Sequence, residues 1–136
     1  MNRSSLQNLA NERIKDAEAL LMAGRWSGAY YLAGDAVECA LKACFAKQTR
    51  EYDFPQKSAQ KVFTHNISEL LSLAGINTLR NNDIKTSQAQ KLNWAIVEEW
   101  NESTRYEIWT EVQARQLYEA VNHSTEGAMT WIIKHW

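Results

Sequence analysis

The sequence predicts an all-α protein, an antiparallel four-helix bundle with one or two additional short helices. Its 136 residues include one proline and five glycines, and almost no stretch alternates apolar and polar residues as a half-buried strand does. Apolar residues instead recur at helical spacing between cap and stop signals. Long amphipathic helices joined by short connections favour antiparallel neighbours. A chain of this length is expected to form a single domain, residues 1–136.

The first helix is expected to run from about Ser4 to Ala23. Ser4 and Gln7 have the spacing of a capping box, and Gly24 follows at the position where helices commonly end. The stripe of this helix that we expect to be buried consists of Leu6, Leu9, Ile14, Ala17, Leu20 and Leu21.

The second helix, from about Ser27 to Gln48, is predicted to have two chemically different faces. At about 100° per residue, one face carries small residues that allow a neighbouring helix to approach closely: Ala29, Ala33, Ala36, Val37, Ala40 and Cys44. The opposite face carries a polar stripe of Tyr31, Asp35, Glu38 and Lys42, which makes it the candidate working face. A polar segment at residues 49–60 follows, and its Pro55 makes it the first candidate mobile loop.

A short third helix is predicted to begin with the cap pair Asn66 and Glu69 and to end at Gly75. The stretch NTLRNNDIKTS, residues 77–87, is polar and is predicted to form turns rather than a helix.

The C-terminal part of the chain is predicted to contain two more helices. Ser87 and Gln90 begin a fourth helix, which is expected to run through Glu99. Thr110 and Gln113 cap a last helix, which is predicted to continue without a break to the end of the chain because its apolar residues keep helical spacing.

Composition excludes some classes of function. Lys and Arg number 15 against 16 Asp and Glu, so no basic field favours bulk binding of nucleic acids or anionic membranes, and any contact with a polynucleotide is expected to be local. No run approaches the roughly 18 apolar residues of a membrane span. The start of the sequence, MNRSSLQNLANER, lacks the apolar core of a secretion signal, so we expect a cytoplasmic protein.

Neither a disulfide nor a metal site is expected. Cys39 and Cys44 lie on one predicted helix with Cα atoms about 7.5 Å apart, too far for an unstrained bridge, so both are interpreted as reduced packing residues. His65, His123 and His135 are widely scattered and match no zinc-binding spacing. We expect no cofactor.

Six tryptophans are many for a bundle of this size. Five of them lie in the C-terminal half: Trp94, Trp100, Trp109, Trp131 and Trp136. More aromatic surface is present than we expect one small core to enclose. We therefore hypothesise a self-association surface built partly from these aromatic residues and partly from the second helix.

Several segments together resemble a HEPN-domain protein of the small prokaryotic type. The segments cover nearly the whole chain: WSGAYYLAGDAVECALKACFAK, THNISELLSLAG, WNESTRY and the closing GAMTWIIKHW. The most specific residues are Glu38, Lys42 and Phe45 on the second helix, His65 at the entry to the third, and the Arg105–Tyr106 pair. The resemblance implies an antiparallel helical bundle, frequent homodimers, and nucleotidyltransferase partners in toxin–antitoxin, phage-defence or stress systems.

The resemblance also implies a test for ribonuclease activity. Many members of the family are metal-independent ribonucleases that carry an Arg, four to six residues, and then a His near the last long helix. This motif is absent, because the admissible positions after Arg105 hold Thr110, Glu111 and Val112. Arg115 and His123 are separated by seven residues, one more than the motif allows, and on a regular helix they would lie about 12 Å apart along the axis.

If the active residues are rearranged, the sequence still offers candidates for metal-free RNA cleavage. Arg105 would contact phosphate and His65 or His123 would transfer protons, while Asp35 or Glu38 would orient them. Each residue also has a structural interpretation. Glu38 and Lys42 have the spacing of a surface helix pair, and Arg105 could pin a loop by binding helix-end carbonyls.

The function that the sequence favours is a dimerising module that binds a partner protein, such as a nucleotidyltransferase, or a nucleotide or RNA. The polar stripe, Arg105 and Tyr106 would line the binding groove. Two alternatives stay open: a ribonuclease with rearranged active residues, and a structural subunit of a larger assembly.

Overall fold

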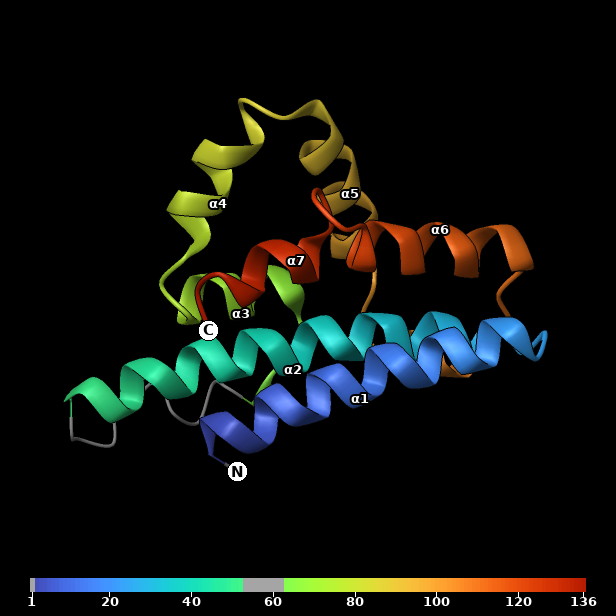
Figure 1. Cartoon of the computed structure of the whole chain (residues 1–136), viewed down its shortest axis with the longest axis horizontal. Helices are drawn as coiled ribbons and strands as arrows, with labels where there is room; N and C mark the ends of the chain where they lie inside the picture. Colours follow the sequence, from blue (N-terminus) through green and yellow to red (C-terminus); the bar gives the residue numbers. More distant parts are fainter. Residues whose placement is uncertain (1, 53–62) are drawn as a thin grey trace.

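The computed structural model describes residues 2–52 and 63–136, and within these ranges every regular element is a helix (Figure 1). The elements are α1 (Arg3–Met22), α2 (Trp26–Tyr52), α3 (Ile67–Leu73), α4 (Asn77–Ile84), α5 (Gln88–Glu98), the 3₁₀ helix η2 (Glu102–Tyr106), α6 (Glu111–Asn122) and α7 (Ala128–Ile133). The all-α prediction is confirmed. None of these helices combines the length and the apolar character that a membrane crossing needs, as far as the described ranges go.

The bundle is built on the long antiparallel pair α1 and α2 (Figure 1). Helix α6 packs against both of them, α5 packs against α6, and α7 contacts α2, α5 and α6. The small-residue face of α2 lies in this core as predicted, since Ala29, Ala33, Ala36, Val37 and Ala40 are fully buried. Close approach of α1 and α2 follows from these short side chains.

Helix α2 ends later than predicted. It continues through residues 49–52, which the sequence assigned to the start of a loop. The remainder of that candidate loop, including Pro55, lies outside the described residues.

The cap signals located most of the helix ends. Asn66, Ser87 and Thr110 accept hydrogen bonds from the backbone N–H groups three residues later, at 2.8, 3.2 and 3.3 Å. Gly24 and Gly75 end their helices with φ of 73° and 75°, which favours glycine. The capping box at Ser4 is wrong, because the Asn2 side chain caps α1 by accepting from the Ser5 N–H at 2.8 Å. Asn is as strong a cap as Ser, and its position places Ser4 inside the first turn.

Residues 77–84 form helix α4 rather than the predicted turns. The residue of α4 that is buried is Arg80, not an apolar residue. Its guanidinium donates to Glu98 Oε1 of α5 at 2.5 Å and lies 5.0 Å from the centroid of the Trp94 ring. The helix is therefore held by a buried charge that apolar periodicity does not detect.

The predicted last helix is broken into α6 and α7. His123 ends α6, and its Nδ1 accepts the backbone N–H groups of Thr125 and Glu126 at 3.2 and 2.9 Å. The chain then turns so tightly that a Cβ on Gly127 would lie 2.5 Å from the Val121 carbonyl oxygen. The apolar residues keep their helical spacing across this break, so the spacing does not reveal it. The break itself is made by the His123 side chain and by Gly127.

The core encloses more aromatic surface than we expected. Trp94, Trp100 and Trp131 are 1, 1 and 3% exposed, and Trp26, Trp109 and Trp136 pack partly buried against the core. Trp94, Trp100 and Trp131 are therefore core residues, and a self-association surface built partly from the other aromatic residues and partly from α2 stays a prediction. The large apolar residues that are exposed in the described ranges are instead Met22, Phe63, Leu79, Leu92, Tyr106, Ile108, Val112 and Ile133.

Cys39 and Cys44 are both free and buried, which agrees with their interpretation as packing residues. Burial raises the pKa of each thiol to about 12. Because the thiolate is the reactive form, we expect the native protein to resist iodoacetamide at mildly alkaline pH and to take up two equivalents after denaturation. Native labelling at the rate of a small free thiol, followed by mass spectrometry, would contradict this burial.

Candidate functional site

The polar stripe of α2 faces η2 and the entry to α3, and its central residue is buried. Glu38 is 5% exposed, while Tyr31, Asp35 and Lys42 are half-buried. The Lys42 Nζ lies 3.9 Å from Glu38 Oε2, and the Arg13 Nε of α1 lies 3.4 Å from Asp35 Oδ2. The stripe is therefore a charged seam within the fold and not a solvated helix face.

His65 connects this seam to η2. Its Nδ1 pairs with Glu38 Oε1, and its Nε2 lies 3.4 Å from Glu102 Oε2. Both ring nitrogens thus face carboxylate oxygens from two different elements. The Nδ1 nitrogen is engaged by Glu38, while the His65 side chain as a whole is 41% exposed.

Two tryptophans hold η2 against α2. Before η2, the buried Trp100 ring lies on Gly34 of α2, so closely that a Cβ at position 34 would be 2.3 Å from the ring. After η2, Trp109 stacks on Tyr30 with ring centroids 3.8 Å apart and planes 8° apart, and its backbone N–H donates to Ser27 Oγ at 2.9 Å. Helix α2 therefore fixes the position of η2 at both ends.

Arg105 is the exposed cation of the site, with 45% of its side chain accessible. Its Nη2 donates to the Tyr106 hydroxyl at 2.5 Å, and its guanidinium carbon lies 4.7 Å from the centroid of the Tyr106 ring. Arg105 also forms a long ion pair with Glu102, in which Nη1 lies 3.8 Å from Glu102 Oε1. Tyr106 is itself 76% exposed, so this pair presents a cation and an aromatic ring together to solvent.

The surroundings of the seam raise the pKa values of two of its residues, Glu38 and Tyr31. Burial raises the pKa of Glu38, the charge of Lys42 and a hydrogen bond with His65 lower it, and the neighbouring Asp35 raises it further. Burial also raises the pKa of Tyr31, with a further rise from Asp35, and a hydrogen bond from Arg105 opposes it. Buried ionisable groups with charged neighbours of this kind are common at functional sites.

The structure brings seven of the residues selected from the sequence into one cluster: Tyr31, Asp35, Glu38, Lys42, His65, Arg105 and Tyr106. Glu102 and Arg13 also belong to it and were not selected. Glu102 could have been found, because it stands three residues before Arg105 in the same WNESTRY segment. No spacing in the sequence relates Arg13 to Asp35.

His123 does not join the cluster. It caps the end of α6, and its Nδ1 is used by the turn that follows. Arg115 lies on the same helix, where its Nε donates to Glu111 Oε2 at 2.9 Å and its guanidinium lies 5.3 Å from the centroid of the Trp26 ring. Neither member of the overlong Arg115–His123 pair is therefore placed with Arg105. In the part of the chain that the structure describes, no group of three or more His, Cys, Asp or Glu side chains is arranged to hold a metal ion.

Comparison with known proteins agrees with the all-α fold. Searches of curated proteins and of solved structures returned no match. The family model described as "HEPN domain" matches residues 4–136. This match spans nearly all of the sequence, and the chain therefore belongs to the HEPN-domain family.

Proposed function

We propose that this HEPN domain binds the phosphate of a nucleotide or RNA at Arg105 and Tyr106, and that it does so without cleaving it. The observation that carries this proposal is the exposure of Arg105 at the edge of a cluster whose other charges face one another. A guanidinium matches the geometry of phosphate, and an exposed aromatic ring can stack on a base.

Binding rather than cleavage is supported by the surroundings of His65. A general base must reach the proton that it abstracts, whereas both nitrogens of His65 face the carboxylates of Glu38 and Glu102. The absence of the Arg-(four to six residues)-His motif after Arg105 supports the same proposal.

The proposal extends to assembly. HEPN domains often dimerise, and we propose a cytoplasmic homodimer that works with a partner protein, such as a nucleotidyltransferase, in a toxin–antitoxin, defence or stress system. Family membership supports this part of the proposal.

The test is the affinity for a short, fluorescently labelled single-stranded RNA, measured by anisotropy, with a mononucleotide as competitor. We expect Arg105→Ala to weaken binding by about tenfold or more, which corresponds to about 1.4 kcal/mol. Arg115→Ala removes the same charge from an exposed position on α6 and is the matched control, for which we expect nearly unchanged affinity.

The same mixtures, run on a denaturing gel, separate binding from catalysis. We expect the RNA to remain intact with wild type and with both variants. Equal affinities for wild type and Arg105→Ala would reject the binding site, and cleavage that His65→Ala abolishes would favour a ribonuclease with rearranged active residues.

A further inference from the structure

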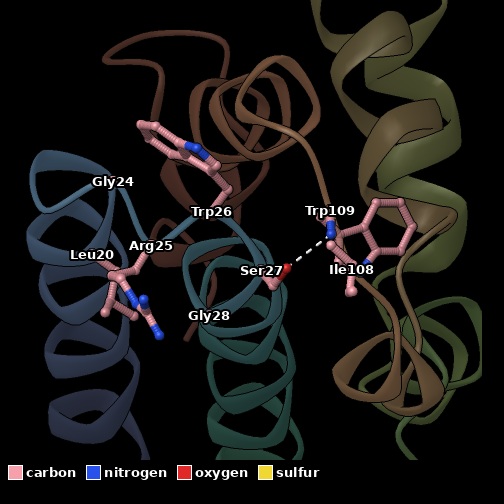
Figure 2. Close-up of a pocket in the computed structure, with 8 residues that line it drawn as sticks. All are labelled: Leu20, Gly24, Arg25, Trp26, Ser27, Gly28, Ile108 and Trp109. Carbon is pink, nitrogen blue, oxygen red and sulfur yellow. Dashed lines mark hydrogen bonds between the residues drawn. The ribbon is translucent and has the colours of Figure 1, made fainter.

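A groove of about 440 Å³ lies between the α1–α2 turn and the segment that follows η2. Its lining comprises Leu20, Gly24, Arg25, Trp26, Ser27, Gly28, Ile108 and Trp109. Figure 2 shows Leu20 and Arg25 on one side, Ile108 and Trp109 on the other, and Ser27 between them. Its size is within the range of about 300 to 1,000 Å³ that ligand sites occupy.

Glycine keeps the floor of this groove open. Gly28 presents no side chain, and a Cβ there would lie 3.2 Å from Leu20 Cδ1. Gly24 adopts φ of 73° at the turn, a conformation that other residues rarely adopt. A larger side chain at position 28 would therefore occupy the space between the two sides.

The walls combine exposed apolar surface with one cation. Ile108 is 94% exposed, although it is a β-branched apolar residue in a fixed segment. Arg25 is the charged residue of the lining, and it forms no ion pair with the residues that the structure describes. The groove thus combines apolar and polar surface, and its lining holds one cation, Arg25, and no carboxylate.

Exposed apolar residues continue beyond the groove. Met22 and Val112 are 83 and 75% exposed, and they lie close in sequence to the turn and to Ile108. The Arg115 guanidinium over the Trp26 ring links the groove to the surface between α1 and α6. Apolar residues, aromatic rings and Arg are the residue types that protein interfaces favour.

We propose that this groove docks a segment of a partner protein that presents a bulky apolar side chain beside a carboxylate. The apolar side chain contacts Leu20 and Ile108, and the carboxylate pairs with Arg25. Charge selects this occupant over a second copy of the chain, because a two-fold interface confined to this lining would pair the lining with itself, and the lining holds no carboxylate to face Arg25.

The proposal is independent of phosphate binding at Arg105, and the experiment separates the two. The probe is a library of random peptides displayed on phage and selected on wild-type protein. We expect the selected peptides to combine Asp or Glu with a bulky apolar residue. Their affinities, measured with synthetic labelled peptides, are expected to fall by about tenfold or more in Gly28→Leu, which fills the groove, and in Arg25→Glu, which reverses its charge.

Two controls match these variants. Leu92→Ser removes an exposed apolar side chain outside the groove, as Ile108→Ser does within it, and only Ile108→Ser is expected to weaken peptide binding. Arg105→Ala should leave peptide binding unchanged, while the groove variants should leave RNA binding unchanged. Circular dichroism verifies that each variant is folded.

Three outcomes would overturn the proposal. The first is that no peptide is selected, and the second is that the selected peptides bind Gly28→Leu and Arg25→Glu as well as wild type. The third is a fall in oligomer mass of the groove variants in sedimentation, which would assign the surface to a second copy of the chain.

Discussion

Replacing Gly34 with alanine is expected to destabilise the protein by about 2 to 3 kcal/mol and to displace η2. A Cβ at this position would lie 2.3 Å from the Cγ, Cδ1 and Cδ2 atoms of Trp100. The ring is 1% exposed, so a shift of the ring must displace the residues packed around it. Because Trp100 leads directly into η2, any shift of the ring also moves Arg105.

Gly28→Ala is the matched control for this prediction. Its Cβ would meet only the flexible end of Leu20, at 3.2 Å, and alanine gains up to about 1 kcal/mol of helix propensity over glycine. Denaturant unfolding should therefore show a lower free energy of unfolding for Gly34→Ala than for wild type, and an unchanged or higher one for Gly28→Ala. Unfolding of Gly34→Ala at the wild-type midpoint would contradict the close packing of Trp100 on α2.

Replacing Arg80 with alanine is expected to reduce the free energy of unfolding by about 3 kcal/mol. The Arg80 side chain is 9% exposed and its partner Glu98 is 29% exposed, so the variant leaves a poorly solvated carboxylate without a cation. The contact of the guanidinium with Trp94 is lost as well. Helix α4 should then separate from α5 before the rest of the bundle unfolds.

Two further variants isolate the cause of this loss. Arg115→Ala removes an exposed pair with Glu111 and should cost about 0.5 kcal/mol or less. Combining Arg80→Ala with Glu98→Ala should cost less than the sum of the two single changes, because the unpaired carboxylate is gone. Additive losses, measured by denaturant unfolding, would show that the Arg80–Glu98 pair is not the stabilising contact.

The sequence predicts those parts of the fold in which apolar periodicity and cap chemistry agree. The small-residue face of α2 and the caps at Asn66, Ser87 and Thr110 are such parts. Helix α4 was missed because its buried residue is Arg80, whose cation is paired with a residue eighteen positions away. The break before α7 was missed because a histidine side chain makes it, while the apolar spacing continues.

Residues of the candidate site could be predicted where they lie on one helix face or belong to a segment that resembles the family. Spacing alone placed Glu38 beside Lys42, and the resemblance added His65 and Arg105. The pairing of Arg13 with Asp35 depends on how α1 lies on α2, which no local pattern records. The groove was not predicted either, because it arises from packing of the α1–α2 turn against a distant segment.

The most direct measurement of the central claim is an NMR titration of the protein with short single-stranded RNA, observed at arginine side-chain and tyrosine ring resonances. We predict that Arg105 and Tyr106 show the largest shifts, that these shifts saturate together, and that the RNA stays intact. Unchanged Arg105 resonances, with the largest shifts at exposed arginines elsewhere such as Arg25 and Arg115, would contradict the claim that Arg105 is the phosphate-binding residue.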